Sequence, residues 1–417
     1  MTGPVVPAQN TPNGRAQTGL VAPDLLQAEQ PRRAADWYEL FFDLVFVAVI
    51  AVSADLIEGD PQLSTVVLFV LLFSPLWWAW VNLMVTNNLY GTRFPAIGAL
   101  VIAAMPGAAA MAIAISGSIT NYGWLYAAGA AYIRLVLLVM WLIPYVTRVA
   151  VVRLWRPLAY NLGTAVLWLI SIGVAAPGRY WLWALAVAAE VFLLAFHPGG
   201  LANEIYDRAV VSHLLERVGL FVVIVIGEAV YLSVTGLVAL PTIGGGAAAL
   251  FGFLVCALLA RAFFRWGAPT AERGLTAAQQ AHSYGAMRDV VMYLPFVLVT
   301  ALTLIAAAIG IAVVDASAPM GLSVRTLLAC GIGGFYLANA AVGLRLGRPI
   351  GGIALLLVPA LVLSAAACFL SGGLAAWATL ALAALALVLL EVVSRMLSTR
   401  PGRVDSGLGP EPTTATS

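Results

Sequence analysis

The segment Trp37–Leu56, WYELFFDLVFVAVIAVSADL, decides the fold, because it is an apolar run long enough to cross a membrane. Its first turns carry two carboxylates, Glu39 and Asp43, which are four residues apart and therefore share one face of a helix. A charge at bilayer depth costs roughly 3 kcal/mol on insertion scales, so such groups are usually buried, paired and functional. A second segment, His213–Ser233 (HLLERVGLFVVIVIGEAVYLS), has the same character: Glu216 and Arg217 lie at its start and Glu228 lies deeper.

The composition is that of an integral membrane protein with many spans. Hydrophobic residues make up 62% of the 417 residues and charged residues only 10%, against about 25% in soluble proteins, and the mean hydropathy is +0.97. The net charge of +2 is too small to favour nucleic acid as a partner. All 21 basic residues are arginine, which excludes lysine Schiff-base chemistry and a P-loop. The sequence contains no GxSxG or HExxH motif and no recognisable nucleophile–base pair. We therefore expect that the protein is not an enzyme and has no cofactor.

The apolar runs predict an all-α fold, a polytopic helical bundle with about twelve transmembrane helices. The expected spans are residues 37–57, 63–84, 95–116, 122–147, 157–176, 180–197, 213–236, 246–266, 288–313, 322–344, 350–372 and 374–396. Only Pro177-Gly178-Arg179 separates the fifth span from the sixth, and only Gly372-Gly373 separates the last two, so fusion of either pair would change the count. We expect residues 36–398 to form the transmembrane domain. Residues 1–35 and 399–417 are expected to be disordered cytoplasmic tails.

Arginine placement predicts the orientation in the membrane. With a cytoplasmic N-terminus, sixteen arginines fall in inside segments and only Arg179 and Arg325 in outside loops, which places both termini in the cytoplasm. Two polar segments, His197–Ser212 and Glu272–Met287, would also be cytoplasmic. The second of them is expected to be an interfacial helix or an extension of the ninth span.

Recurring features at similar spacing suggest an internal repeat. Glu39 and Glu216 open the first and seventh spans, Arg156-Pro157 and Arg348-Pro349 follow the fourth and tenth, and Glu190 and Glu391 lie in the sixth and twelfth. The halves, about 36–197 and 213–398, would be parallel because each contains an even number of helices. The alternative is that these residues recur by chance.

The first and seventh spans resemble the bacterial low temperature requirement protein A (LtrA) family. Glu39–Val47 (ELFFDLVFV) matches the signature of the family's first span. A second block matches at His213, Leu214, Glu216, Arg217, Gly219, Leu220, Phe221, Gly227 and Glu228, and a weaker match lies at Trp77-Trp78-Ala79-Trp80. The turn after it, Val81–Arg93, departs from the family's pattern. The resemblance extends over roughly residues 35–395 and implies a bacterial inner-membrane protein, although the family's name refers to a growth phenotype and gives no molecular activity.

A more distant resemblance concerns the endolysosomal potassium channel family, whose two six-helix repeats each begin with a Phe-Ser-Asp signature. Phe41–Phe46 (FFDLVF) is similar to that signature, with Phe42 in place of the serine. The seventh span has Gly219-Leu220-Phe221 and lacks the aspartate. The resemblance implies that the first helices of the two repeats line a pore.

The candidate pathway for an ion or solute consists of Glu39, Asp43, Glu216, Arg217 and Glu228. Glu39 could instead be a carboxylate favoured by the helix dipole at the membrane interface. Arg217 and Glu228 are too far apart along one helix to pair, so we expect Glu39 or Asp43 to pair with Arg217. Arg134 would pair with Glu228 or Glu190, and a structural ion pair between Arg134 and Glu190 is the alternative to a transport role.

No metal site is predicted. His213 precedes Glu216 by three residues, a spacing that binds metal in some bundles, but those bundles carry several such motifs. We expect His213 at the cytoplasmic end, bonded to backbone or lipid phosphate. Cys256, Cys330 and Cys368 show no CxxC spacing and are expected to be core residues.

The predicted function is therefore a channel or transporter for a small ion or solute, with the lipid bilayer as partner. A non-transporting scaffold or sensor in a cold or stress response is the alternative, and a homo-oligomer is left open. In that alternative, the ionisable groups would all be paired in a dry core.

Overall fold

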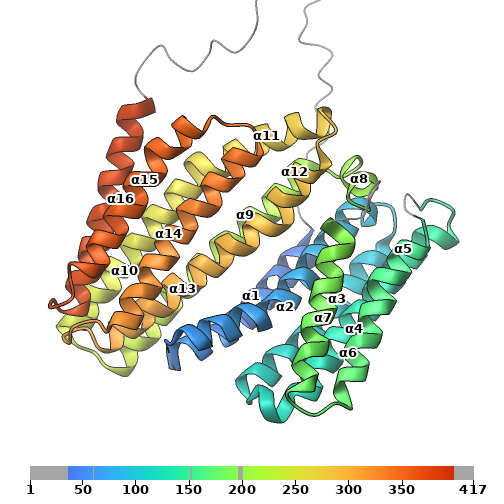
Figure 1. The fold of residues 1–417 in the computed structure, drawn as a ribbon, viewed down its shortest axis with the longest axis horizontal. Helices are drawn as coiled ribbons and strands as arrows, with labels where there is room; N and C mark the ends of the chain where they lie inside the picture. The colour runs from blue at the N-terminus through green and yellow to red at the C-terminus, as the bar shows by residue number, and fades with distance from the viewer. Residues whose placement is uncertain (1–35, 60, 151–152, 196–200, 399–417) are drawn as a thin grey trace, which may run out of the picture. The chain divides into compact units, whose positions relative to one another are not determined.

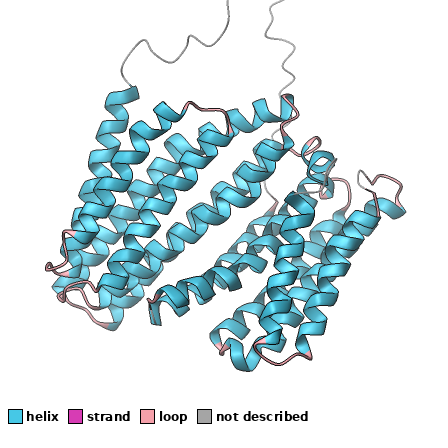
Figure 2. Ribbon diagram, viewed as in Figure 1, coloured by secondary structure: helices cyan, strands magenta, loops and turns pink. Residues whose placement is uncertain are grey.

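Long apolar runs become helices in a membrane because only a helix satisfies every backbone N–H and C=O within its own segment. The computed structural model describes residues 36–59, 61–150, 153–195 and 201–398, and those residues form helices and no strand (Figures 1 and 2). One isolated antiparallel bridge joins Pro319 and Ala375. The predicted tails, residues 1–35 and 399–417, lie outside the described residues.

The first part of the chain contains α1 (Trp37–Gly59), α2 (Leu63–Tyr90), α3 (Pro95–Ser116), α4 (Ile119–Val146), α5 (Trp155–Pro157), the π-helical segment η2 (Leu158–Leu162), α6 (Gly163–Ile172) and α7 (Gly178–Ala195). The second part contains α8 (Leu201–Tyr206), α9 (Val211–Ala239), α10 (Ile243–Ala262), η3 (Phe263–Gly267), α11 (Ala268–Gln280), α12 (Tyr284–Arg288), η4 (Asp289–Tyr293), α13 (Leu294–Val314), α14 (Leu322–Arg345), α15 (Ile350–Phe369) and α16 (Ala376–Ser398). Both η3 and η4 are π-helical and continue the helices beside them.

Ten of the described helical stretches are long and apolar enough to cross a membrane. The predicted fifth and sixth spans are not among these ten. The fifth is divided into α5, η2 and α6, where Pro157 removes a backbone donor near the start, and the sixth is the short helix α7. Neither doubtful pair is fused, since residues 173–177 separate α6 from α7 and residues 370–375 separate α15 from α16.

The polar segment Glu272–Met287 differs in part from its prediction. Its first part belongs to α11, which continues α10 through η3 as one helical stretch from Ile243 to Gln280. That first part thus extends the eighth predicted span, whereas the last residues, Tyr284–Met287, continue through η4 into α13 and extend the ninth, as predicted. A π-helical turn, Phe263–Gly267, carries the helix past Pro269, because its wider hydrogen bonding tolerates the missing proline donor.

Small residues bring neighbouring helices close together. A Cβ on Gly129 of α4 would lie 2.5 Å from the Gly107 carbonyl oxygen of α3, and one on Gly331 of α14 would lie 2.9 Å from the Ala301 carbonyl oxygen of α13. Close backbone approach of this kind stabilises helix pairs within membranes, where apolar burial gives no driving force. These two helix pairs are the most extensive in the described structure.

The first and second parts of the chain meet along one seam. Helices α1 and α2 pack there against α9 and against α13 with η4, while α3, α4, α6 and α7 lie on one side and α10, α14, α15 and α16 on the other (Figure 1). All these helices belong to one compact unit. The seam brings together α1 and α9, the two helices that carry the predicted pathway residues.

Candidate functional site

A buried ion pair joins the first turns of α1 and α9. Asp43 accepts two hydrogen bonds from Arg217, from Nε at 2.7 Å and from Nη2 at 2.5 Å, in the bidentate geometry that a guanidinium and a carboxylate favour. The indole Nε1 of Trp80, from α2, donates to the same carboxylate at 2.8 Å. The guanidinium also lies 5.9 Å from the ring centre of Phe42. Hydrogen bonds to this one aspartate therefore connect α1, α2 and α9.

Glu39 extends this pair into a network. Its carboxylate lies 3.2 Å from Nη1 of Arg217 and 3.1 Å from Nε2 of His213, and it accepts a hydrogen bond from the side-chain amide of Asn87 in α2. It also accepts from the backbone N–H of Asp36 at 2.9 Å, which satisfies one of the free donors at the start of α1. We call Glu39, Asp43, His213 and Arg217 the charge network.

Asn88 fixes the orientation of His213. Its Oδ1 accepts the backbone N–H of Val210 at 2.9 Å, so its Nδ2 faces Nδ1 of His213 at 2.9 Å. In this arrangement Nδ1 is the acceptor and Nε2–H donates to Glu39. The start of α9 is thereby held against the end of α2.

The charge network is buried and, among the described residues, contains more negative than permanent positive charge. Each of its four side chains is at most 1% exposed. Two carboxylates face one guanidinium, and the hydrogen bonds around His213 are those of a neutral imidazole. Neutral donors from Trp80, Asn87 and Asp36 stabilise the remaining negative charge. A cation or proton brought into the network would balance that charge.

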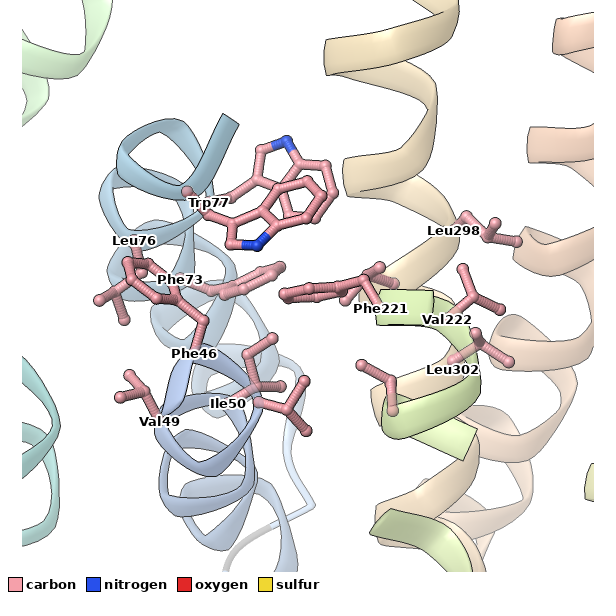
Figure 3. Close-up of a cluster of buried hydrophobic side chains, with 14 of the residues drawn as sticks. Phe46, Val49, Ile50, Phe73, Leu76, Trp77, Phe221, Val222, Leu298 and Leu302 are labelled. Carbon is pink, nitrogen blue, oxygen red and sulfur yellow. The ribbon is translucent and has the colours of Figure 1, made fainter. Parts of the chain in front are cut away.

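An aromatic cluster lies beside the network in the seam. It consists of Phe46 of α1, Phe73, Trp77 and Trp80 of α2, and Phe221 of α9, each at most 1% exposed, and we call it the aromatic plug. Phe221 lies with its ring centre 4.5 Å from that of Trp80 and 5.6 Å from that of Trp77. Figure 3 shows Phe73 and Trp77 facing Phe221 and Val222, with Leu298 and Leu302 of α13 behind them. The seam is closed at this level by bulky apolar side chains.

Glu216 does not join the network. Its side chain is exposed, whereas His213 and Arg217 on the same helix are buried. At 100° per residue, Arg217 lies about 40° from His213 on one side and Glu216 about 60° on the other, so neighbouring residues point in different directions. Glu216 therefore lies outside the charge network, and its place on a pathway stays a prediction.

Glu228 lies further along the seam, among other carboxylates. It interacts electrostatically with Asp55, and Glu58 interacts with both of them. Glu58 packs against Gly310 of α13, because a Cβ added to Gly310 would lie 2.9 Å from Oε1 of Glu58. Glu228 also lines a small cavity between α1, α9 and α13, whose other walls include Ile50 and Thr303. It pairs with no arginine in the described structure.

Arg134 and Glu190 form a separate ion pair within the first part of the chain. Nη2 of Arg134 in α4 lies 2.5 Å from Oε2 of Glu190 in α7, and both side chains are at most 2% exposed. The guanidinium lies 5.5 Å from the ring centre of Tyr160 in η2. The pair therefore connects α4, η2 and α7, away from the seam.

Sequence reasoning missed the groups that α2 supplies. Trp80, Asn87 and Asn88 all bind the charge network, and His213 binds Glu39 instead of backbone or lipid. Two adjacent asparagines at the end of an apolar run were the available signal, since an amide at that depth needs buried partners. No group of three or more metal-ligating side chains occurs among the described residues.

Comparison with known proteins agrees with this architecture. Residues 34–393 match the family model described as bacterial low temperature requirement A protein (LtrA). The chain belongs to this family. The LtrA match spans both α1 and α9, and thus the whole charge network. No solved structure matches the chain.

One curated relative is an uncharacterized protein, RA0937, of Rhizobium meliloti (strain 1021). It is 27% identical over 208 residues, which are 47% of this chain and 49% of the relative. The match therefore extends over about half the length of that relative. Its name assigns no activity.

Proposed function

We propose that this LtrA-family chain is a channel or transporter for a small ion or solute, with its pathway along the seam between α1, α2, α9 and α13. The observation that carries the proposal is the charge network: two carboxylates and one guanidinium, almost fully buried, at the junction of the two parts of the chain. Ionisable groups at membrane depth mark ion and proton pathways in other membrane proteins. The excess negative charge favours a cation or a proton.

In this proposal the described structure is a closed state. The aromatic plug blocks the seam beside Asp43 and Arg217, as hydrophobic constrictions do in gated pores. Glu228 and its carboxylate neighbours would attract cations to the other end of the seam. Glu39, Asp43 and Arg217 would then release their partners as the seam opens, while Glu216 lies outside the charge network.

We further propose twelve spans in two parallel six-helix halves, the first from α1 to α7 and the second from α9 to α16. The helix contacts support this: α1 with α3, α3 with α4, α4 with α6 and α6 with α7 correspond to α9 with α13, α13 with α14, α14 with α15 and α15 with α16. Pro95 is the first residue of α3, and Pro295 is the second residue of α13. Ser171 and Ser371 each hydrogen-bond with the following helix, through Trp183 and Thr379.

The proposed location is the bacterial inner membrane, with both termini in the cytoplasm, as the arginine distribution favours. The bilayer is the partner that the apolar helices require, and a homo-oligomer is compatible with their exposed apolar faces. We propose no catalysed reaction and no cofactor.

A second candidate is a non-transporting scaffold or sensor in a cold or stress response. The pairing of every charge in the network, in a core that excludes water, favours it, because such pairs can fix helix register without carrying anything. A cold response has a physical basis in the aromatic plug, since hydrophobic stabilisation weakens on cooling. Both candidates predict a folded bundle, so flux has to separate them.

The test is potassium and proton flux through purified protein in liposomes under an imposed potassium gradient. Glu39→Gln removes the excess negative charge and leaves the bidentate Asp43–Arg217 pair intact, so it tests the pathway with the least risk to folding. Asp43→Asn tests the pair itself, and Glu216→Gln is the matched control on the exposed face of the same region.

The proposal predicts flux above that of empty liposomes, altered by Glu39→Gln and abolished by Asp43→Asn, with Glu216→Gln unchanged. Absence of potassium and proton flux would remove the ion pathway. Flux that survives Asp43→Asn in a folded protein would place any pathway elsewhere.

A further inference from the structure

A cleft in the described structure lies away from the seam. It has a volume of about 680 Å³, including its mouth, and lies between η3 with α11, α14 and α15. Its floor is apolar and contains Trp266, Phe335, Ile353 and Leu356. Gly343 and Gly352 line it and leave the space that larger side chains would fill.

An arginine without an ion pair in the described structure lines this cleft. Arg348 lines it from the turn between α14 and α15, and its side chain is exposed and makes no ion pair in the described structure. The indole N–H of Trp266 is buried and has no hydrogen-bond partner there. Thr270 and Asn339 add polar atoms to the lining. The cleft therefore has an apolar floor and, in Arg348, an exposed positive charge at its edge.

The depth of the cleft corresponds to the border between headgroups and hydrocarbon. Arg348 precedes Ile350, the first residue of α15, and Leu356 lies about 9 Å further along that helix at 1.5 Å per residue. The guanidinium is thus at the end of a membrane span and the apolar floor is within it. Basic pockets between spans at this depth bind the headgroups of anionic lipids.

The corresponding place in the first part of the chain is more filled. Between α2, α4 and η2, the side chains of Trp141, Pro157 and Tyr160 occupy the space, and Tyr206 of α8 lies over it. A smaller cavity of about 450 Å³, against about 680 Å³ for the cleft beside α14, remains there. Packing of this helix arrangement therefore does not require a cleft. The one beside α14 is open because small residues lie where the first part has large ones.

We propose that this cleft binds one anionic phospholipid, with its phosphate on Arg348 and the upper part of an acyl chain against Trp266, Ile353 and Leu356. A phosphate supplies acceptors for the guanidinium, and an acyl chain covers the apolar floor. The inference goes beyond the proposed ion pathway and does not depend on it.

The test is native mass spectrometry of the purified, delipidated full chain, titrated with phosphatidylglycerol or with phosphatidylcholine of the same acyl chains. The wild-type protein is expected to retain one phosphatidylglycerol more tightly than phosphatidylcholine. Arg348→Gln should weaken that retention about fivefold, which corresponds to about 1 kcal/mol for one arginine near an anionic lipid. Gly352→Leu fills the cleft and should abolish it.

Two control variants match these changes. Arg273→Gln removes an exposed arginine from α11 outside the cleft, and Gly351→Leu alters the neighbouring glycine, which does not line it. Both should retain phosphatidylglycerol as the wild type does. Equal retention of the two lipids, or equal loss in cleft and control variants, would overturn the proposal. Displacement of the lipid by inorganic phosphate alone would also overturn it, because the site would then bind a free anion.

Discussion

Replacing Asp43 by Asn should destabilise the bundle by about 3–5 kcal/mol, the usual cost of removing one partner of a buried ion pair. The contacts lead to a similar figure. Asp43 accepts two hydrogen bonds from Arg217 and one from Trp80, and an asparagine carbonyl can keep the bond from Trp80. The two lost bonds involve charged groups at about 1.5–3 kcal/mol each, and the remaining contact of Arg217 with Glu39 offsets part of that loss.

A double-mutant cycle separates this pairing from simple loss of packing. Asp43→Asn leaves Arg217 with Glu39 alone, and Arg217→Gln leaves Asp43 without its guanidinium. The double variant removes both members of the Asp43–Arg217 pair, so the combined loss should fall short of the sum by about 1–3 kcal/mol. The measurement is reversible unfolding in mixed detergent micelles. Glu216→Gln, one residue from Arg217 on the exposed face, should change stability by less than about 0.5 kcal/mol. Additive losses in the cycle would refute the assignment of Asp43 and Arg217 as a coupled pair.

Three further predictions use the same unfolding assay. Trp80→Phe keeps most of the ring but removes the donor to Asp43, and should cost about 2 kcal/mol; a loss below about 0.5 kcal/mol would contradict the hydrogen bond. Gly129→Ala forces α3 and α4 apart and should cost about 1–3 kcal/mol, whereas Gly227→Ala, with open space around it, should be neutral or slightly stabilising. Arg134→Gln should cost about 3–5 kcal/mol, and replacing Arg134 and Glu190 together by leucine should cost less than the single change; the opposite order would exclude a structural ion pair.

The sequence predicted the architecture well because membrane burial leaves few alternatives. Every long apolar run became a helix, and the need to neutralise charge at bilayer depth limited Arg217 to carboxylates such as Glu39 and Asp43. Arg134 had the same limitation, and the structure pairs it with Glu190 rather than Glu228. These are cases in which the energetic cost of the unpaired state is large enough to select the partner.

Features with a smaller energetic cost were harder to predict from the sequence. The partners of His213 depended on how α2 packs against α9, which periodicity does not reveal, and neutral groups such as Asn87 and Asn88 carry a smaller cost when misplaced. The continuation of α10 into α11 depended on a π-helical turn, which no residue pattern predicted. Spacings of three and four residues rotate in opposite directions around a helix, which explains why Arg217 joins the charge network and Glu216 does not.

The charge count of the network bears on how the seam could open. Separating α1 from α9 would expose Asp43, Glu39 and Arg217 together, and the intact pair strongly opposes that. A proton or cation that neutralises one carboxylate would leave the other carboxylate paired with the guanidinium. One of the two carboxylate–guanidinium contacts between α1 and α9 would then weaken, and no buried charge would lose its partner. A ligand shifts such an equilibrium only as far as it prefers one state over the other. An ion that binds the excess carboxylate more tightly in the loosened state than in the closed state would favour the loosened state. A network with equal numbers of carboxylates and guanidinium groups would offer the ion no such carboxylate.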